Sequence, residues 1–440
     1  MKVKCLLLAV AMLLTLTGCA AFGGDVETQL RPPKAEGEQG EIEEALRDYI
    51  ASTLTQENYV LKYPGSGDYR SAFVVQDLDS DGNDEALAFY RLGAENGTTH
   101  INLLRQTGGK WDSVHDYEST ASDIESVCFG DMDGDGIQEL FVCWDMYSSR
   151  TYQLSLYMLG GNRISERFTG TCAQVTVGDL TGDGRDDCLS FNMDADGLSA
   201  TLWEMRDGAM EQLGHTLVDS VVQQLSQVEI RPLSEKENGV FLDYAKSVEF
   251  MQTALIRWDG IRLLTPLYPA ESEPGTQTIR PATIPSGDVD GDGVWEWPTC
   301  KWLAGYENEV NDLTDSTKQK TTFWQWDATL GRPVEKFSCI YNAQDRYFLM
   351  MDEQLEQRFT TTYVASSRTL WVYSLVDGQV GEAVFAVRTL PGGTEPEEQE
   401  TEYKFRSLTE SEMAEYTVWF KEDNEYAINK ETLQYMLTLL

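Results

Sequence analysis

Four short acidic segments contain the residues of this chain that are best suited to bind a metal ion. They read DLDSDGNDE from Asp77, DMDGDGIQE from Asp131, DLTGDGRDD from Asp179 and DVDGDGVWE from Asp288. Each has oxygen-bearing side chains at positions 1, 3, 5 and 9, and Asp-Gly at positions 5 and 6. Several carboxylates in one short loop are ligands for a hard cation, and the glycine permits a turn that other residues resist. We therefore predict four cation-binding sites and refer to the segments as the first to fourth acidic loops.

The spacing of the acidic loops indicates a repeat architecture. The first three begin 54 and 48 residues apart, whereas the gap of 109 residues before the fourth is about twice as long. A fifth unit is therefore expected near residue 233, where the chain reads RPLSEKENGVFLDYA. This stretch has the turn residues Asn238-Gly239 but no spaced aspartates, and it predicts a degenerate repeat without an ion.

The residues after the loops exclude the EF-hand. An EF-hand loop ends with glutamate at position 12 and leads into a helix, but position 12 here is Ala88, Val142, Ser190 or Thr299. Short apolar runs follow instead (ALAFY, LFVCW, CLSFN and WPTC) and predict buried strands. Hairpin patterns recur downstream around Gly109, Gly161, Gly208, Gly260 and Gly331. Each unit of about 50 residues thus has room for four strands, the size of one propeller blade.

In these loops and strands the chain resembles FG-GAP/VCBS repeats, as in the integrin α-subunit propeller, over roughly residues 57–338. The resemblance implies a mainly β fold, a β-propeller of at least five such blades. It also implies up to four structural Ca²⁺ ions, each held by the side chains at positions 1, 3, 5 and 9 and the carbonyl at position 7. Because Thr181 removes one charge, we expect the third site to be the weakest. Carried over, the ligands are Asp77, Asp79, Asp81, Asn83, Glu85; Asp131, Asp133, Asp135, Ile137, Glu139; Asp179, Thr181, Asp183, Arg185, Asp187; and Asp288, Asp290, Asp292, Val294, Glu296.

The N-terminus predicts export and anchoring. Lys2 and Lys4 precede an apolar run that is too short to span a bilayer comfortably and has the layout of a secretory signal. The following Leu-Thr-Gly-Cys19 resembles a bacterial lipoprotein signal, which implies cleavage before Cys19 and its lipidation; an ordinary signal peptide is the alternative. We expect a signal peptide at 1–18, a flexible tether at 19–40, and an extracytoplasmic, membrane-anchored lipoprotein of the bacterial cell envelope.

Both ends of the repeat region carry additional elements. Residues 41–56 predict an amphipathic helix, which packs on the propeller edge or binds a partner, with one face of Ile42, Ala45, Leu46, Tyr49, Ile50 and Leu54. Residues 339–440 predict a small C-terminal α+β domain, or a divergent last blade with a helical cap. Its expected helices are TESEMAEYTVWF (409–420) and NKETLQYMLTLL (429–440), the second with Asn429 as N-cap.

Other chemically capable residues form no recognisable catalytic group. His100, His115 and His215 are scattered and are expected to be neutral surface residues, and no G-x-S-x-G or H-E-x-x-H motif occurs. Six cysteines remain after Cys5 and Cys19; they are either buried thiols or disulfides within a blade, such as Cys128–Cys143 and Cys172–Cys188. Two aromatic segments form either strand cores or a sugar- or peptide-stacking surface; they contain Tyr147, Tyr152, Trp295, Trp297, Trp302 and Tyr306.

The composition narrows the range of possible functions. A formal net charge of −39 argues against binding to nucleic acid or to anionic lipid, while 41% hydrophobic and 11% aromatic residues predict a folded protein. We expect a calcium-stabilised, lipid-anchored cell-surface binding or adhesion protein without catalytic activity, whose partner is a protein or a glycan. The alternatives are an envelope polysaccharide-processing enzyme, which requires a funnel at the propeller axis lined by Arg, Tyr and acidic residues, and a scaffold subunit of an envelope assembly.

Overall fold

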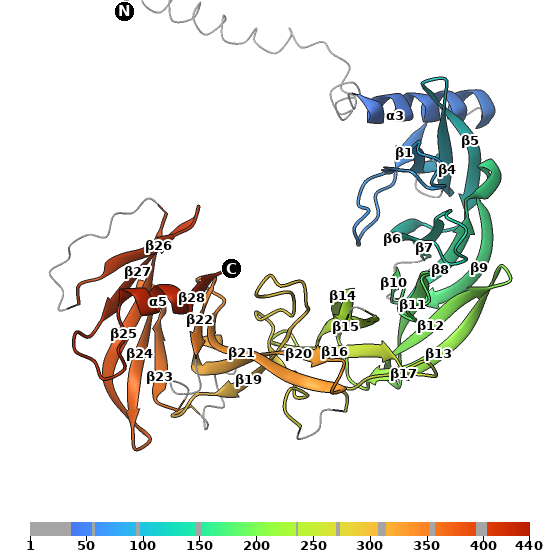
Figure 1. Ribbon diagram of the computed structural model, residues 1–440. Helices are drawn as coiled ribbons and strands as arrows, with labels where there is room; N and C mark the ends of the chain where they lie inside the picture. The colour runs from blue at the N-terminus through green and yellow to red at the C-terminus, as the bar shows by residue number, and fades with distance from the viewer. Residues whose placement is uncertain are drawn as a thin grey trace, which may run out of the picture. The chain divides into compact units, whose positions relative to one another are not determined.

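The computed structural model (Figure 1) describes residues 37–54, 58–93, 97–146, 151–234, 236–269, 273–306, 314–351, 357–392 and 403–440. The expected signal peptide, Cys19 and most of the tether lie outside these ranges, as does Tyr147. The chain divides into two compact units. The first takes residues up to 63, 71–120 and 162–164; the second takes 64–70, 121–161 and 165–440. In the described residues, no helix is both long and apolar enough to cross a membrane.

The first unit is an antiparallel sheet covered by one helix. Helix α3 (Glu38–Tyr49) continues as the π-helical segment η1 (Ile50–Leu54) and contacts β4 and β5. All six residues of the predicted apolar face pack in its core, with Ile42, Leu46 and Ile50 at most 1% exposed. The helix begins at Glu38, so three residues of the expected tether are helical. Sheet 1 comprises β1 (Tyr59–Leu61), β2 (Phe73–Gln76), β3 (Glu85–Leu92), β4 (Thr99–Thr107) and β5 (Lys110–Ser119).

Three sheets of antiparallel strands begin the second unit, with their neighbours mostly in chain order. Sheet 2 contains β6 (Asp123–Gly130), β7 (Glu139–Asp145), β8 (Tyr152–Met158) and β9 (Ser165–Cys172). Sheet 3 contains β10 (Gln174–Gly178), β11 (Asp187–Asp194), β12 (Gly197–Arg206) and β13 (Ala209–Asp219). Sheet 4 contains β14 (Gln224–Ser234), β15 (Glu237–Ala245), β16 (Phe250–Trp258), β17 (Leu263–Leu264) and β18 (Arg280–Pro281).

Two further sheets and a short helix complete the second unit. Sheet 5 contains β19 (Trp297–Trp302), β20 (Gln319–Asp327), β21 (Arg332–Asn342), β22 (Tyr347–Met351) and the C-terminal β28 (Leu437–Leu439). Sheet 6 contains β23 (Phe359–Val364), β24 (Thr369–Val376), β25 (Gln379–Pro391), β26 (Arg406–Glu410) and β27 (Ala414–Phe420). Helix α5 (Lys430–Met436) contacts β22, β26 and β27. The short helical turns are η2 (Gly160–Asn162), η3 (Ser316–Lys318) and η4 (Ala365–Ser367).

These sheets confirm the predicted class, a mainly β protein of propeller-type blades. In the second unit the cores join consecutive sheets: Phe141 and Met205 link sheets 2 and 3, and further shared cores link sheets 3 and 4, 4 and 5, and 5 and 6. The predicted hairpins form, for example at Asp207-Gly208, where both residues have positive φ as a tight hairpin turn requires. The degenerate repeat near residue 233 is sheet 4, whose first two strands are joined without an acidic loop.

The expected helix at 409–420 is wrong. Residues 406–410 and 414–420 form the β26–β27 hairpin instead. Ala414, Tyr416 and Val418 lie on one face of β27 and are buried, and Thr417 on the other face is buried as well. This burial overrides the helical tendency of the Glu- and Met-containing part. The second helix is confirmed in part. The Asn429 side chain caps it by accepting a bond from the Thr432 N–H at 3.0 Å, but Leu437–Leu439 is a strand. The expected boundary between 338 and 339 falls inside β21.

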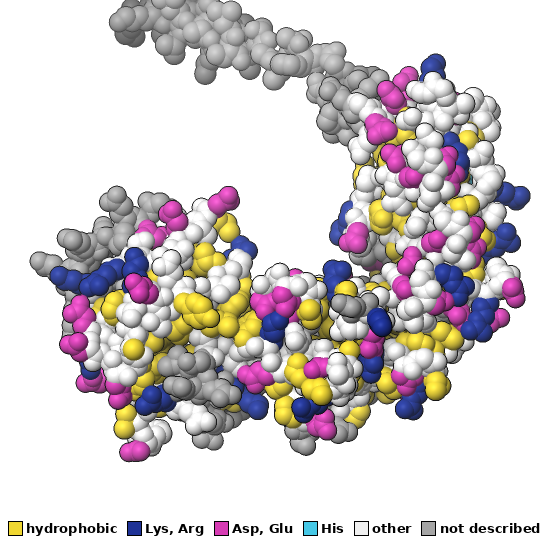
Figure 2. All heavy atoms as spheres, viewed as in Figure 1, with side chains coloured by type: hydrophobic (Ala, Val, Ile, Leu, Met, Phe, Trp, Pro, Cys, Tyr) yellow, Lys and Arg dark blue, Asp and Glu magenta, His cyan; other side chains and the backbone are white. Residues whose placement is uncertain are grey.

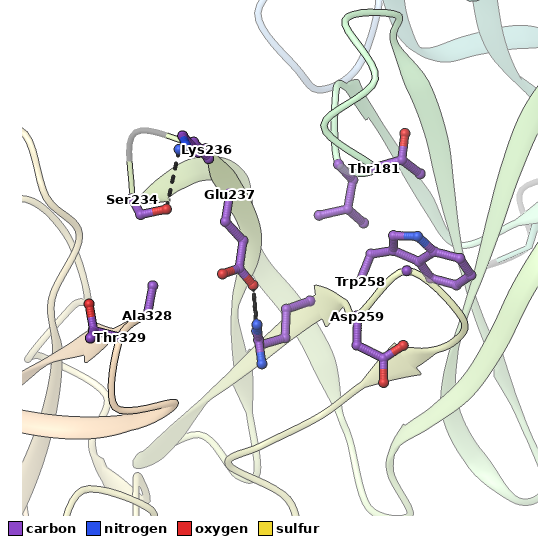
Figure 3. Close-up of a pocket in the computed structure, with 11 residues that line it drawn as sticks. Thr181, Ser234, Lys236, Glu237, Trp258, Asp259, Ala328 and Thr329 are labelled. Atoms are coloured by element: carbon purple, nitrogen blue, oxygen red, sulfur yellow. Dashed lines mark hydrogen bonds and ion pairs between the residues drawn. The ribbon is translucent and has the colours of Figure 1, made fainter.

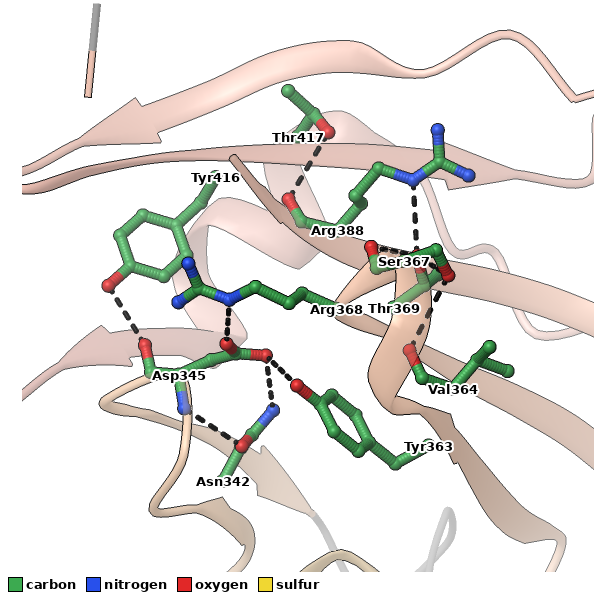
Figure 4. A network of polar contacts seen from close by, with 10 residues as sticks. All are labelled: Asn342, Asp345, Tyr363, Val364, Ser367, Arg368, Thr369, Arg388, Tyr416 and Thr417. Carbon is green, nitrogen blue, oxygen red and sulfur yellow. Dashed lines mark hydrogen bonds and ion pairs between the residues drawn. The ribbon is translucent and has the colours of Figure 1, made fainter. Parts of the chain in front are cut away.

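Sheets 5 and 6 are held together by a buried carboxylate (Figure 4). Asp345, in the turn between β21 and β22, is 1% exposed. Its carboxylate accepts bonds from Arg368 Nε at 2.7 Å, Tyr363 Oη at 2.9 Å and Asn342 Nδ2 at 3.1 Å. Its main-chain carbonyl accepts from Tyr416 Oη at 3.0 Å. Three of these donors come from sheet 6 or the turn beside it, so this carboxylate fixes how the last sheet docks.

Sheet 4 encloses a second buried ion pair. The Arg280 side chain is wholly buried, and its Nη2 lies 2.9 Å from Asp243 Oδ2. Its other nitrogens donate to Thr253 Oγ1 at 2.8 Å and to the carbonyls of Ile284 and Thr278 at 2.6 and 3.2 Å. The network ties the segment around β18 onto β15 and β16.

All six cysteines of the repeat region are free thiols, so neither anticipated within-blade disulfide is present. Four of them gather in the core between sheets 2 and 3, where Cys143 Sγ lies 3.2 Å from Cys172 Sγ. Cys143 and Cys172, which make this sulfur–sulfur contact, were each expected in a different disulfide.

Candidate metal centre

Each acidic loop immediately precedes a strand, which begins at position 9 in the first three loops and one residue later in the fourth. The first three lie between β2 and β3, β6 and β7, and β10 and β11, while the fourth leads to β19. In every case the residue at position 9 pairs with the residue just before position 1; the pairs are Gln76–Glu85, Gly130–Glu139, Gly178–Asp187 and Gly287–Glu296. The hairpin therefore closes each loop and places its position-9 carboxylate at the loop base.

The fold of the loops is encoded by their aspartates and glycines. The position-6 glycines have φ between 85° and 88°, a conformation that a side chain would strain. Their N–H groups each donate to the position-1 aspartate at 3.0 Å. The position-5 aspartate accepts the N–H of position 7 at 2.8 to 2.9 Å, from Asn83, Ile137, Arg185 and Val294.

In three loops the carboxylates at positions 1, 3 and 9 converge, with ligand atoms within 4.8 Å of one another. The groups are Asp77, Asp79 and Glu85; Asp131, Asp133 and Glu139; and Asp288, Asp290 and Glu296. The position-5 residues Asp81, Asp135 and Asp292 lie outside these groups. Three carboxylate oxygens from one short loop are of the ligand type that Ca²⁺ prefers and would supply part of its roughly six to eight oxygen ligands.

The base of the second and fourth loops contains buried carboxylate oxygens that lack a protein partner. Glu139 and Glu296 are 0% exposed. Their Oε2 atoms accept the N–H groups of Met132 at 2.8 Å and Val289 at 3.0 Å. Their Oε1 atoms, and Oδ1 of Asp79 in the first loop, have no hydrogen-bond partner among the described residues. An anionic oxygen buried in this way is costly without a positive charge, so the donor set fits a cation.

The third loop departs from this geometry. Thr181 replaces an aspartate at position 3, and Asp183 is engaged by Arg185 at 2.5 Å. Asp187 is buried, but it accepts the N–H groups of Leu180 at 3.0 Å and Thr181 at 2.8 Å. The third loop is thus not among the convergent carboxylate groups, and the low affinity expected of it stays a prediction.

Basic side chains also differ between the loops. Arg105 from β4 lies 2.8 Å from Asp79 and 3.6 Å from Glu85 in the first loop. Lys336 from β21 contacts Asp292 and lies 3.4 Å from Asp290 in the fourth, which raises the pKa of the lysine. In the part of the chain that the structure describes, no Lys or Arg forms an ion pair with the second loop. The second loop therefore has the least compensated negative charge.

These carboxylates make the metal-free protein pH-sensitive. Burial, reinforced by neighbouring aspartates, raises the pKa of Glu139 and of Glu296 to about 7, against roughly 4.3 in an unfolded chain. The native state then holds protons that the unfolded state releases, so stability is highest below about pH 4.3 and falls as pH rises to about 7. We expect the urea midpoint in metal-free buffer to fall from pH 5 to pH 7.5. The E139Q/E296Q variant should show a shallower fall; a midpoint that rises with pH would contradict the assignment.

A polar groove lies where the first strands of sheets 2, 3 and 4 approach one another. Its volume is about 920 Å³, and β6, β10 and β14 line it together with residues 66–69. Glutamine, serine and threonine side chains line it together with Glu125 and Glu229, interspersed with apolar residues such as Val127 and Ile230. Tyr69, Tyr152 and Arg231 also line it. Arg, Tyr and acidic residues, the types expected at the propeller axis of a polysaccharide-processing enzyme, thus occur together in this groove.

A smaller hollow of about 540 Å³ lies beside the short turn between β14 and β15 (Figure 3), the connection that carries an acidic loop in other repeats. Glu237 projects into its centre, and its Oε1 accepts from Arg257 Nε at 2.7 Å. The Arg257 guanidinium lies 5.0 Å above the Trp326 ring. Thr181, Lys236, Trp258 and Asp259 complete the wall.

Two expectations for other residues are corrected or narrowed. His100 is not a surface residue: it is 3% exposed, with Nδ1 2.7 Å from Asp116 Oδ2 and Nε2 3.0 Å from Thr98 Oγ1. Asp116 also accepts hydrogen bonds from Tyr90 and Asn102, which places His100 in a network across β3, β4 and β5. The only sign of this network in the sequence is the alternating pattern of the strand THINLL, which contains His100 and Asn102. Trp295 and Trp297 are 8% and 0% exposed, so both belong to the strand core.

Figure 2 shows acidic side chains spread over the visible face. This distribution agrees with the net charge of −39. It indicates a solvated acidic surface in addition to the loops.

Comparisons with known proteins agree with the repeat assignment. The family model of the FG-GAP-like repeat matches residues 77–142, which include the first two acidic loops. No curated protein matches the sequence.

Among solved structures, the chain is similar to Sqt1 from Saccharomyces cerevisiae (TM-score 0.32, 12% identity, covering 80% of this chain and 98% of that one). It is also similar to a protein from Lactobacillus plantarum (TM-score 0.31, 8% identity, 72% and 84%) and to a rhamnogalacturonan lyase from Bacillus licheniformis (TM-score 0.31, 10% identity, 71% and 74%). Likenesses at this level carry no conclusion about function.

Proposed function

We propose that the protein is a calcium-stabilised binding protein, anchored by lipid on the bacterial cell envelope, whose repeats present a polar groove to a glycan or protein. The observation that carries the calcium assignment is the set of convergent carboxylates, three of which (Asp79, Glu139 and Glu296) bury an oxygen without a partner. Export to a compartment where Ca²⁺ is abundant, expected from the N-terminal sequence, would suit sites of modest affinity.

The chain's own residues supply the site. The aspartates at positions 1 and 3 and the acid at position 9 would hold the ion, and Ca²⁺ would supply the positive charge that the buried Glu139 and Glu296 lack. The position-1 aspartates also accept the position-6 N–H and so keep the loop in its ligating conformation. Because the second and third loops join the first two strands of sheets 2 and 3, an ion there would stabilise β6 and β10, which line the groove.

Calcium binding is tested directly by isothermal titration calorimetry of the mature chain with Cys19→Ser, to keep it soluble. We expect Ca²⁺ to bind at the first, second and fourth loops, whose carboxylates converge, and more weakly at the third loop. Glu139→Gln should remove one of the tighter sites, whereas Glu118→Gln on β5, outside the loops, should leave the stoichiometry unchanged. The absence of saturable Ca²⁺ binding would remove the calcium assignment.

The groove is proposed as the binding site because its lining suits a hydroxyl-rich ligand. Glutamines and carboxylates can donate to or accept from sugar hydroxyls, and tyrosine rings can stack on sugar faces. We expect the mature chain to retain glycans on an array in Ca²⁺ and to lose them in Tyr69→Ala and Glu229→Gln variants. A Trp258→Ala change in the smaller hollow serves as the control. Equal loss in all three variants, or binding to proteins but not glycans, would contradict the glycan assignment.

A second candidate is an envelope polysaccharide-processing enzyme, favoured by the presence of Tyr69, Tyr152, Arg231 and two glutamates in the same groove. Release of reducing ends or unsaturated products from polysaccharides retained in the binding assay would support it. Binding without turnover over long incubation would leave the non-catalytic function.

A further inference from the structure

The second and third acidic loops contact each other through a reciprocal pair of hydrogen bonds. The main-chain N–H of Asp131, position 1 of the second loop, donates to Asp186 Oδ2 at 2.9 Å. The N–H of Asp186 donates back to the carbonyl of Asp131 at 3.0 Å. Asp186 is position 8 of the third loop and immediately precedes Asp187, a residue expected to be a ligand. Asp131 and Asp186 therefore both lie within loops that are predicted to bind a metal ion.

The packing around this pair leaves little room for movement. A Cβ atom on Gly130, just before the second loop, would lie 2.3 Å from Val177 Cγ1 and 3.0 Å from Asp186 Oδ2. A Cβ on Gly134 would lie 3.1 Å from the Arg185 side chain. Because closely packed atoms cannot move independently of one another, a shift of the third loop would also move the main chain of the second loop.

A similar contact joins the third loop to sheet 4. Asn238 Nδ2 donates to the carbonyl of Asp179, position 1 of the third loop, at 2.6 Å. Asn238 lies at the start of β15, as Asp186 lies just before β11. The repeat in sheet 4 lacks an acidic loop, yet it retains a side chain that holds the position-1 residue of the loop before it.

We infer that Asp186 is a positioning residue that couples the second and third calcium loops, and that Asn238 positions the third loop from sheet 4. The inference rests on the proposed calcium binding. The Asp131 carboxylate accepts the N–H groups of Gly134, Asp135 and Gly136 at 2.8 to 3.1 Å. A change in the position of the Asp131 main chain would therefore disturb both this loop conformation and the orientation of the carboxylate toward the ion. Ligands on both sides of Asp186, the carbonyl of Arg185 and the carboxylate of Asp187, would fix Asp186 when Ca²⁺ is bound at the third loop. Occupancy of one site then favours the other by the same factor in both directions.

The test uses the mature chain with Glu85→Gln and Glu296→Gln, so that Ca²⁺ binding reports the second and third loops. In this parent we expect the two sites to bind cooperatively in calorimetric titrations. Asp186→Ala should weaken the second site about tenfold, a mid-range coupling, and should abolish the cooperativity. Asp186→Asn retains an acceptor oxygen and should restore most of the affinity. Asn238→Ala should weaken the third site with a smaller effect on the second.

The chain offers a matched control in Asp84, which is position 8 of the first loop, is exposed, and has no acidic loop before it. Asp84→Ala, made in a chain that keeps Glu85, removes the same charge from the same loop position, and it should change the affinity of the first site less than twofold. An Asp186→Ala effect no larger than this control would overturn the inference. If Asp186→Ala fails to fold, Asn238→Ala decides: a third-site affinity equal to that of the parent would overturn the positioning of the loops by these side chains. A parent that binds no Ca²⁺ would instead overturn the proposed function.

Discussion

Chelation of Ca²⁺ is expected to destabilise the protein more than any single substitution. An ion that binds only the native state stabilises it by RT ln(1 + [L]/Kd), about 2.7 kcal/mol per site at one hundred times Kd. Three convergent loops would together contribute about 8 kcal/mol, a large part of the 5–15 kcal/mol typical of folded domains. The physical reason is the charge of each loop: without the ion, three carboxylates converge and Glu139 and Glu296 bury an unpartnered oxygen.

The measurement is urea unfolding at pH 7.5 in 50 mM CaCl₂, on the order of one hundred times the Kd of extracellular Ca²⁺ sites, and in EDTA at matched ionic strength. Mg²⁺ at equal concentration is the control, because it demands a tighter octahedral geometry and should restore less stability. Glu139→Gln should remove about a third of the calcium-dependent difference and leave the rest. An identical midpoint in CaCl₂ and EDTA would show that the loops do not hold a stabilising ion.

Replacement of Arg280 by methionine is the substitution with the largest expected effect. Arg280→Met leaves the Asp243 carboxylate, which is 2% exposed, without its counter-charge, and breaking a buried pair in this way typically costs about 3–5 kcal/mol. The bonds to Ile284 and Thr278 are lost as well, which releases the segment around β18. Urea unfolding in saturating Ca²⁺ should show the full loss.

Two variants make this result interpretable. Arg262→Ala removes an arginine whose side chain is 75% exposed and pairs with Asp259 at 3.5 Å; such surface pairs contribute little, so its midpoint should not move. The double change Arg280→Met/Asp243→Leu removes both charges and should recover much of the stability. A midpoint for Arg280→Met equal to that of Arg262→Ala would show that the buried pair does not contribute.

The sequence could predict the parts of this protein that local chemistry determines. The acidic loops depend on contacts within nine residues, so their aspartates and glycines were sufficient to anticipate the turn and the position-9 carboxylate. The face of helix α3 follows from the spacing of Ile42, Leu46 and Ile50, and the ion-free repeat in sheet 4 followed from the gap between loops.

What could not be predicted depends on contacts between distant residues. Residues 409–420 form a hairpin because β27 pairs with β25, more than twenty residues earlier, and this burial outweighs local propensity. The ion pair of Arg280 with Asp243 and the contact of Cys143 with Cys172 both join different strands. The bond of Asp131 to Asp186 joins two repeats, and neither loop taken alone contains any sign of it.

The position of β28 has a consequence for how the protein matures. β28 pairs with β22 through Leu437–Leu439, and the N–H of Leu440 donates to the carbonyl of Arg346 at 3.0 Å. The chain thus leaves sheet 5 at β22, builds the whole of sheet 6, and returns with its last residues. During synthesis, β22 remains an open edge, the kind of strand that invites pairing with another chain, until residues 437–439 are available to pair with it. Pairing of β28 therefore protects the edge of sheet 5, and loss of residues 437–440 would leave β22 exposed to association with another chain.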